Sequence, residues 1–209
     1  GKVSFYNETS DGPIKPTPLI GVLGLMEKSP LLPSPPIEND VIILLGETKD
    51  ELGGSEYYEY IHNFIGGTVP KVDIPTSKKN MTSVLSLISK KLVKNVHDCS
   101  KGGLAVALSE LCIFGNVGCN VNLKNVSDMS IEGSLFSESH SRYLLVVKKK
   151  YIRSIKELLS KNKCSFSQIG IFSGDQIIFT STTKPILKLR VDKAENLYLN
   201  SLERIIQNG

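Results

Sequence analysis

The 209-residue sequence contains few of the residues from which metal sites and disulfide networks are built. It has four cysteines and three histidines: Cys99, Cys112, Cys119 and Cys164 form no CxxC pair, and the histidines lie far apart. Structural zinc sites need closely spaced cysteines and histidines, and small secreted folds need paired cysteines. The sequence therefore argues against both a structural zinc site and a disulfide-rich fold.

Long apolar runs are also missing. No stretch approaches the roughly 20 apolar residues that a membrane-spanning helix needs, and the first residues lack the apolar core of a signal peptide. We therefore expect a soluble, cytoplasmic protein with no membrane partner.

The sequence has only a modest excess of positive charge: 25 Lys and Arg residues against 21 Asp and Glu residues give a net charge of +4. The lysines are scattered and cluster only briefly, at residues 78–79, 90–91 and 148–150. Scattered lysines are typical of solvated surfaces, whereas nucleic-acid-binding proteins concentrate them on one face. We therefore expect no nucleic-acid partner. The lysines and glycines also form no phosphate loop of the Walker type.

The sequence does contain alternating strand and helix patterns. Strand patterns occupy residues 1–9, 19–27, 41–48, 118–123 (an edge strand) and 143–147, another ends at His97-Asp98, and residues 166–172 and 176–180 form a predicted hairpin. Helical patterns begin at Ser55-Glu56, Met81, Leu104 and Ile152, and the last one runs through Ile206. This alternation predicts an α/β or α+β fold with one mixed sheet covered by helices.

A proline-rich segment divides the chain. Residues 29–40 contain four of the ten prolines, a composition typical of a semi-rigid linker. We expect residues 1–30 to end a preceding domain, residues 31–40 to be the linker, and residues 41–209 to form a complete domain. The first residues alternate like a strand entered in mid-structure, so we expect a fragment of a longer protein.

Residues 97–114, HDCSKGGLAVALSELCIF, predict a strand, a turn and a helix. Ser100 stands where a helix N-cap would, and Gly102 and Gly103 give the turn backbone freedom. The N–H groups at such a helix start can bind an anion. Alternatively, the two glycines only let the helix pack close to its strand.

Two further polar turns lie next to predicted strands: one follows the strand at 41–48, and the other precedes the strand at 143–147. Residues 53–56, Gly-Gly-Ser-Glu, open a helix in the same way, although Ser55 could be a plain N-cap. The turn before the strand at 143–147 carries Glu138, Ser139, His140 and Arg142. Its arginine and glutamate could form a surface ion pair of small energetic value. Together the three turns indicate a ligand without identifying it.

Seven segments in a fixed order carry a family resemblance: GKVSFYNET, PTPLIGVLGL, LLGET, ELGGSEY, VHDCSKGGLAVALSE, LFSESHSR and IGIFSG. Together they resemble the C-terminal part of the synthetase component of phosphoribosylformylglycinamidine synthase, up to about residue 180. That family shares the fold of aminoimidazole ribonucleotide synthetase. The resemblance implies that residues 1–30 end a second ATP-binding-type domain, and that the catalytic histidine of the family lies outside these 209 residues.

The resemblance also implies a reaction. The family converts formylglycinamide ribonucleotide, ATP and glutamine-derived ammonia to formylglycinamidine ribonucleotide, ADP and phosphate. It implies ATP and Mg²⁺ as cofactors. The implied partners are a glutaminase subunit, a small accessory subunit and the rest of the synthetase chain. These 209 residues alone are expected to be inactive.

Two sets of site residues follow from the family motifs. In the GNVS motif, here Gly1-Lys2-Val3-Ser4, Gly1 is expected to contact ATP and Ser4 the substrate. Lys2 replaces the asparagine that binds magnesium, and an ammonium has only donors. Either Lys2 contacts phosphate or metal binding is lost there. A second-copy ligand site is expected at Asp98, Ser100, Gly102, Gly103, Glu138 and Ser139.

Alternatives remain open. Asp98 could merely cap the helix start, and the second-copy site could hold a structural nucleotide or no ligand at all. The same fold serves selenophosphate synthetase, thiamine-phosphate kinase and a hydrogenase-maturation enzyme. A different class is a non-catalytic nucleotide-binding or docking domain.

Overall fold

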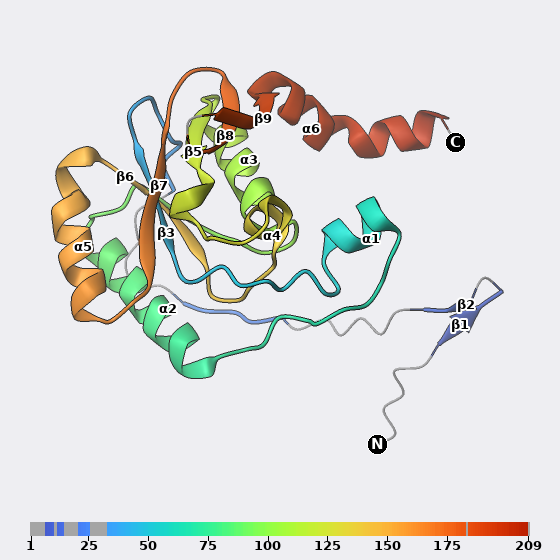
Figure 1. Cartoon of the computed structure of the whole chain (residues 1–209), viewed down its shortest axis with the longest axis horizontal. Coiled ribbons are helices and arrows are strands. Elements are labelled where there is room, and N and C mark those ends of the chain that lie inside the picture. Colours follow the sequence, from blue (N-terminus) through green and yellow to red (C-terminus); the bar gives the residue numbers. More distant parts are fainter. Residues whose placement is uncertain (1–6, 11, 15–20, 26–32, 183, 209) are drawn as a thin grey trace.

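The computed structural model describes residues 7–10, 12–14, 21–25, 33–182 and 184–208. Most of them build a seven-stranded sheet with the order β4-β6-β3-β7-β5-β8-β9 (Figure 1). Its strands are β3 (Val41–Leu45), β4 (Asn95–Asp98), β5 (Cys119–Asn122), β6 (Tyr143–Val147), β7 (Phe166–Phe172), β8 (Gln176–Ser181) and β9 (Lys184–Arg190). In this sheet β5 and β8 are parallel, whereas the other neighbouring strands are antiparallel.

Helices cover both faces of the sheet. On one face lie α2 (Ile74–Ser89) and α5 (Ile152–Lys161); on the other lie α3 (Gly103–Gly115), α4 (Ile131–Phe136) and the start of α6 (Val191–Asn208) (Figure 1). Each face has its own apolar core, and alternate residues of β3 enter one core or the other. All five residues of β3 are therefore buried, as expected for a central strand between two helical layers. The predicted mixed sheet covered by helices is confirmed.

The N-terminal segments lie outside this sheet. β1 (Glu8–Thr9) and β2 (Gly12–Pro13) pair only with each other. Residues 21–25 have no regular secondary structure, and Leu23 is fully exposed, so the strand predicted over 19–27 is wrong for this described part. An apolar run becomes a strand only where a neighbouring strand accepts its hydrogen bonds. Gly1, Lys2 and Ser4 lie outside the described residues.

The described part of the predicted linker, residues 33–40, lies along the domain. The N–H of Ser34 donates to the carbonyl of Lys94 at 3.1 Å, and the N–H of Asn39 donates to that of Phe172 at 2.9 Å. Pro36 is buried beside Gly115. The division into domains at this segment stays a prediction.

β5 corrects two predictions. It lies between β7 and β8, so these two strands do not form the predicted hairpin, and β5 is an interior strand rather than an edge strand. Two glycines make room for it. A Cβ on Gly118 would lie 2.3 Å from the carbonyl oxygen of Gln176, and one on Gly170 would lie 2.1 Å from that of Asn120. The alternating pattern of β5 reflects one buried and one polar face, which interior strands also have.

Helix starts were the least predictable boundaries. α2 begins at Ile74 instead of Met81, because Asp73 caps it by accepting a hydrogen bond from the N–H of Thr76 at 3.0 Å. This bond is also the main cause that lowers the pKa of Asp73. Proline in the first turn completes a start signal that the apolar pattern alone does not show. The remaining helices are α1 (Glu56–His62) and two short 3₁₀ turns, Leu123–Asn125 and Lys149–Tyr151.

All four cysteines are free and buried. Burial raises the pKa of the Cys99 thiol to about 11. A hydrogen bond with Cys119, together with burial, raises the pKa of Cys112. No helix in the described part of the chain is long and apolar enough to cross a membrane.

These burials predict slow thiol chemistry in the native protein. Because the thiolate is the reactive form, we expect iodoacetamide at pH 8 to modify the four thiols far more slowly than in urea-unfolded protein. Mass spectrometry would count the labels on each cysteine over time. Fast labelling of Cys99 in protein that keeps its native circular dichroism would contradict the burial.

Candidate functional site

One carboxylate oxygen joins the two glycine-plus-serine turns. Glu138 Oε1 accepts hydrogen bonds from the N–H of Gly102 at 2.9 Å and from the N–H of Glu56 at 3.0 Å. These groups stand at the starts of α3 and α1, where partial positive charge favours an anion. The three turns that the sequence predicted separately therefore meet at one point.

The turn before α3 differs from the prediction in its cap. Gly102, not Ser100, is the N-cap, and no side chain caps this helix. Instead, the backbone carbonyl of Ser100 accepts a hydrogen bond from the N–H of Gly103 at 3.1 Å. Gly102 has a φ of 74° and Gly103 a φ of 64°, a region that favours glycine. A Cβ on Gly103 would also lie 2.5 Å from the carbonyl oxygen of Ser137, so the helix start packs directly against that turn.

The turn before α1 has a plain N-cap. Ser55 Oγ accepts the N–H of Tyr58 at 3.3 Å and donates to the carbonyl of Leu52 at 2.6 Å. The interpretation of Ser55 as a plain helix N-cap is therefore confirmed. The structural glycine here is Gly53, where a Cβ would lie 2.3 Å from the backbone of Thr68.

Arg142 holds the third turn in place from inside the protein. Its side chain is 1% exposed. Nε donates to the carbonyl of Ser139 at 3.1 Å, Nη1 to Thr48 Oγ1 at 3.0 Å, and Nη2 to the carbonyl of Ser137. Burial lowers the pKa of Arg142. The surface ion pair considered for Arg142 and Glu138 is thus wrong, because the guanidinium is buried and bonded to neutral acceptors.

A cavity of about 360 Å³ lies at this meeting point. It is lined by residues that include Asp98, Ser100, Glu138, His140 and Arg142. The pairing of β4 with β6 explains this arrangement, because Asp98 lies opposite Tyr143 and the end of one strand meets the start of the other. Of the predicted second-copy residues, Asp98, Ser100 and Glu138 line this strand-end cavity. The backbone N–H of Gly102 donates to Glu138, which lines the cavity, whereas Gly103 is buried and does not line it.

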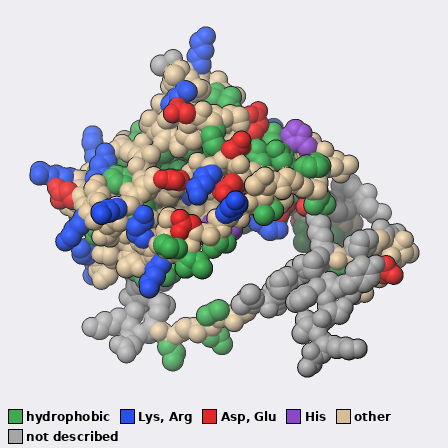
Figure 2. All heavy atoms as spheres, turned by 60° about the horizontal axis from the view of Figure 1, so that its bottom comes forward, with side chains coloured by type: hydrophobic (Ala, Val, Ile, Leu, Met, Phe, Trp, Pro, Cys, Tyr) green, Lys and Arg blue, Asp and Glu red, His purple; other side chains and the backbone are tan. Residues whose placement is uncertain are grey.

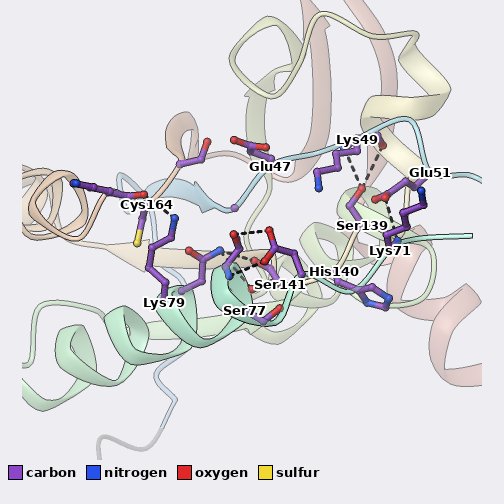
Figure 3. Close-up of a pocket in the computed structure, with 16 residues that line it drawn as sticks. Glu47, Lys49, Glu51, Lys71, Ser77, Lys79, Ser139, His140, Ser141 and Cys164 are labelled. Carbon is purple, nitrogen blue, oxygen red and sulfur yellow. Dashed lines mark hydrogen bonds between the residues drawn. The ribbon is translucent and has the colours of Figure 1, made fainter.

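Ser139 lies on a neighbouring cleft instead. This cleft, of about 390 Å³, shares His140 and Ser141 with the strand-end cavity and is bounded by the loop after β3, the start of α2 and residues 163–165 (Figure 3). Ser139 Oγ accepts the N–H of Lys49 at 3.0 Å. Sequence reasoning missed Lys49, Lys71, Lys79, Asn80 and Lys163 as lining residues. Asn80, a polar residue on the buried face of α2, gave no signal either, because it precedes Met81, where the sequence predicted this helix to begin.

Charges of both signs are mixed on the face shown in Figure 2, where Lys and Arg side chains lie among Asp and Glu. Among the described residues, no group of three or more His, Cys, Asp and Glu could hold a metal ion. A magnesium ion that arrives with nucleotide phosphates usually needs only one or two protein carboxylates. Asp98, an exposed carboxylate beside Ser100, fits that role, whereas Glu138 Oε1 is already bonded to two backbone N–H groups.

The sheet, its helical layers and this strand-end cavity define a known domain class. Residues 38–181 match the family described as AIR synthase related protein, C-terminal domain, and the chain belongs to that family. The chain is 39% identical over 206 residues to phosphoribosylformylglycinamidine synthase subunit PurL of Pyrococcus horikoshii, covering 99% of this chain and 28% of that protein. It is 33% identical over 210 residues to PurL of Alkaliphilus metalliredigens, covering 100% and 28%. The chain thus spans less than a third of the length of these relatives.

Solved structures share the fold. T. maritima PurL complexed with FGAR has a TM-score of 0.69 at 21% identity, covering 77% of this chain and 28% of that one. T. maritima PurL complexed with ATP has a TM-score of 0.64 at 21% identity, covering 79% and 27%. Hydrogenase maturation protein HypE in complex with ATP has a TM-score of 0.52 at 12% identity, covering 76% and 53%. The resemblance inferred from the sequence motifs is confirmed at the level of the family and the fold.

The shared carboxylate predicts a graded mutational effect. Glu138→Ala leaves the N–H groups of Gly102 and Glu56 without their acceptor, and a lost acceptor of this kind costs about 1–3 kcal/mol. Glu138→Gln keeps an oxygen acceptor without the charge, so we expect a smaller loss. Urea denaturation of the two variants and the wild type measures both changes in the free energy of unfolding.

Glu195→Ala, an exposed position on α6, is the control and should change the unfolding free energy little. A loss for Glu138→Ala no larger than that of the control would refute the joining role of this carboxylate.

Proposed function

We propose that this chain is part of an ATP-dependent carbon–nitrogen ligase of purine biosynthesis. The ligase converts formylglycinamide ribonucleotide, ATP and glutamine-derived ammonia to formylglycinamidine ribonucleotide, ADP and phosphate. The observation that carries this proposal is the 39% identity to P. horikoshii PurL, which extends over 99% of the chain. The FGAR and ATP complexes of T. maritima PurL, a protein of the same fold, support the choice of ligands.

The proposed ligand contacts fall in two groups. Gly1 would approach ATP and Ser4 would contact the substrate, as the family motif implies. The second-copy site would use Asp98, Ser100 and Glu138 on the cavity wall, with Gly102 and Gly103 forming the turn behind them and Ser139 on the adjoining cleft. There Asp98 would hold Mg²⁺, Glu138 would keep the two helix starts together, and Arg142 would fix the turn that carries Glu138.

The chemistry is shared between ligand and protein. When bound, ATP with Mg²⁺ supplies the phosphoryl group that activates the amide oxygen of the substrate for displacement by ammonia. In this proposal the residues that line the strand-end cavity orient and neutralise the ligands, and Cys99, whose pKa burial raises to about 11, does not act as a nucleophile. In the proposed assembly, a cytoplasmic complex, the partners are a glutaminase subunit, a small accessory subunit and the rest of the synthetase chain.

A chimera tests the proposed function. We would replace the matching part of P. horikoshii PurL with these 209 residues and measure ADP release with formylglycinamide ribonucleotide, ATP, Mg²⁺ and ammonia. We expect substrate-dependent ADP release from the chimera and none from the 209 residues alone. A folded chimera without that activity would contradict the proposal, and so would activity of the 209 residues alone.

Within the active chimera, Ser4→Ala should raise the substrate KM by up to about tenfold, the value of one lost hydrogen bond of about 0.5–1.5 kcal/mol. Its kcat and melting temperature should change little, because only a hydroxyl is removed. An unchanged KM would remove Ser4 from the substrate site.

Asp98→Asn tests the metal role of the strand-end cavity. A bound ligand at a hundredfold excess over its Kd stabilises a protein by about 2.7 kcal/mol, so Mg-ATP should raise the melting temperature of the wild type. The variant should lose this increase, since an amide offers no charge to the cation, while its ligand-free stability stays close to that of the wild type. An equal increase in both proteins would show that Asp98 holds no metal.

A further inference from the structure

Basic residues are concentrated in one helical layer of this protein. The expectation of no nucleic-acid partner rests on lysines that are scattered along the sequence. Residues 74–94 and 148–163, which contain α2 and α5, together carry twelve Lys and Arg residues against one acidic residue, Glu157. The other 172 residues carry thirteen Lys and Arg against twenty Asp and Glu. The small net charge of the whole chain therefore conceals two parts of opposite sign.

The fold brings these two segments side by side. α2 and α5 cover the same face of the sheet, where Leu87 of α2 and Leu159 of α5 belong to one apolar core (Figure 1). Asn162 Nδ2, at the end of α5, donates to Ser83 Oγ of α2 at 2.9 Å. Because the buried residues of both helices face the sheet, their charged side chains lie on the outer surface of this layer.

Ten of the twelve basic side chains are exposed. We call the outer surface of this layer the basic face and define it by Lys78, Lys91, Lys149, Lys156 and Lys161, which come from both helices and from the turns beside them. In Figure 2, Lys and Arg side chains predominate at the left of the view, the side on which Figure 1 places α2 and α5.

Carboxylates neutralise little of this charge. Glu157 pairs with Arg153, whose Nε lies 2.9 Å from Glu157 Oε1, and Asp40 pairs with Lys94, which is only partly exposed. Asp73, at the start of α2, caps that helix. The five lysines that define the basic face make no ion pair or hydrogen bond through their ammonium groups with a residue in the described part of the chain.

We infer that the basic face binds the phosphate backbone of a nucleic-acid duplex without reading its sequence. A duplex carries one negative charge for about every 1.7 Å of its axis, and lysines that neutralise its phosphates release condensed counterions. The 16-residue helix α2 is roughly 24 Å long, so the basic face spans several phosphates. A lysine surface almost free of carboxylates is the electrostatic pattern of such binding.

The composition of the basic face favours a duplex over a single strand. Proteins that bind single strands stack the unpaired bases on aromatic rings. In residues 74–94 and 148–163 the one aromatic residue is Tyr151, which is partly buried and has the ammonium group of Lys150 over its ring, 4.8 Å from the centroid. The basic face therefore offers cations for phosphates and no stacking surface for bases.

Two other classes of partner fit the basic face less well. Protein–protein interfaces are depleted of lysine and enriched in arginine and aromatic residues. Helical surfaces that bind anionic membranes insert bulky apolar side chains beside their lysines. α2 exposes Ile74, Met81 and Leu85, but α5 exposes no large apolar side chain, so apolar area is confined to one of the two helices.

Fluorescence anisotropy of labelled DNA tests this inference on the 209-residue protein and needs no turnover. The probe is a duplex of about 20 base pairs, roughly 68 Å long and so longer than α2. At physiological salt we expect a Kd of about 1–100 μM, the range of non-specific binding, and the same Kd for a duplex of unrelated sequence. One strand alone should bind more weakly, because no aromatic ring stacks on its bases.

Salt dependence measures how many phosphates the basic face neutralises. The slope of log Kobs against log[salt] changes by about −0.9 for each phosphate, so one phosphate for each of the five defining lysines gives a slope of about −4.5.

The face variant combines Lys78→Gln with Lys156→Gln. The matched control, Lys184→Gln with Lys188→Gln, removes the same charge from exposed positions on β9. At about 0.1 M salt the face variant should bind the duplex about tenfold or more weakly, with a slope flatter by about 2, and the control should match the wild type. Circular dichroism of each variant checks that the fold is intact.

Two competitors separate the other classes of partner. Poly-L-glutamate presents the carboxylates of an acidic protein without phosphate, and vesicles of phosphatidylcholine and phosphatidylserine present an anionic membrane. We expect unlabelled duplex to displace the probe at a lower concentration of negative charge than either competitor. Displacement by a competitor at an equal or lower charge concentration would overturn the inference.

Three further outcomes would also overturn it. One is no binding of the duplex by the wild type at physiological salt. Another is an equal loss in the face variant and the control, which would mean general charge attraction. The third is single-strand binding as tight as duplex binding.

The chimera with P. horikoshii PurL tests the basic face within a chain of the relatives' full length. The face variant should weaken duplex binding of the chimera as well. An unchanged Kd there would mean that other parts of the longer chain cover the basic face, and it would overturn the inference.

Discussion

The hydrogen bonds of Glu138 and Arg142 are the constraint on which the candidate site depends. Glu138 connects the starts of α1 and α3 through one oxygen, and Arg142, four residues later, anchors the same turn to Thr48 and to two carbonyl groups. Arg142 is buried without a direct carboxylate partner, so burial lowers its pKa, and the charges of Glu51 and Glu138 oppose that shift from a longer distance. The negative charge of Glu138 therefore stabilises two helix starts and a buried cation together. Such coupled polar networks fix a unique geometry because a partly satisfied network is costly.

The sequence predicted the parts of this arrangement better than their assembly. Residues 97–103 and 138–142 were both recognised as polar turns next to strands, and both are. Their proximity follows from the antiparallel register of β4 and β6, which pairs Asp98 with Tyr143. Nothing local in either segment specifies that register, since both strands are short and β4 contains only one apolar residue, Val96, so no apolar pattern fixes its pairing.

The missed residues have a similar explanation. The cleft beside the strand-end cavity includes lysines at positions 49, 71, 79 and 163, each of which looks like a solvated surface lysine in its own segment. The start of α2 was missed because the cap at Asp73 precedes the apolar periodicity by more than one turn. The cap at Gly102 replaces the expected Ser100 because left-handed backbone at Gly102 and close packing of Gly103 on Ser137 decide the turn geometry there. Local patterns therefore predicted element types well, and tertiary contacts decided boundaries and neighbours.

The interior position of β5 has a consequence for how this sheet assembles. The strand is complete at Asn122, yet its two neighbours, β7 and β8, begin at Phe166 and Gln176. During synthesis β5 therefore leaves the ribosome with both edges unpaired and waits until more than forty further residues have followed. β7 and β8 do not pair with each other as a local hairpin in the finished sheet, because β5 lies between them and pairs with both. Sheets that depend on such non-local pairing fold slowly, so we expect the pairing of β5 with β7 and β8 to be a slow step in the assembly of this sheet.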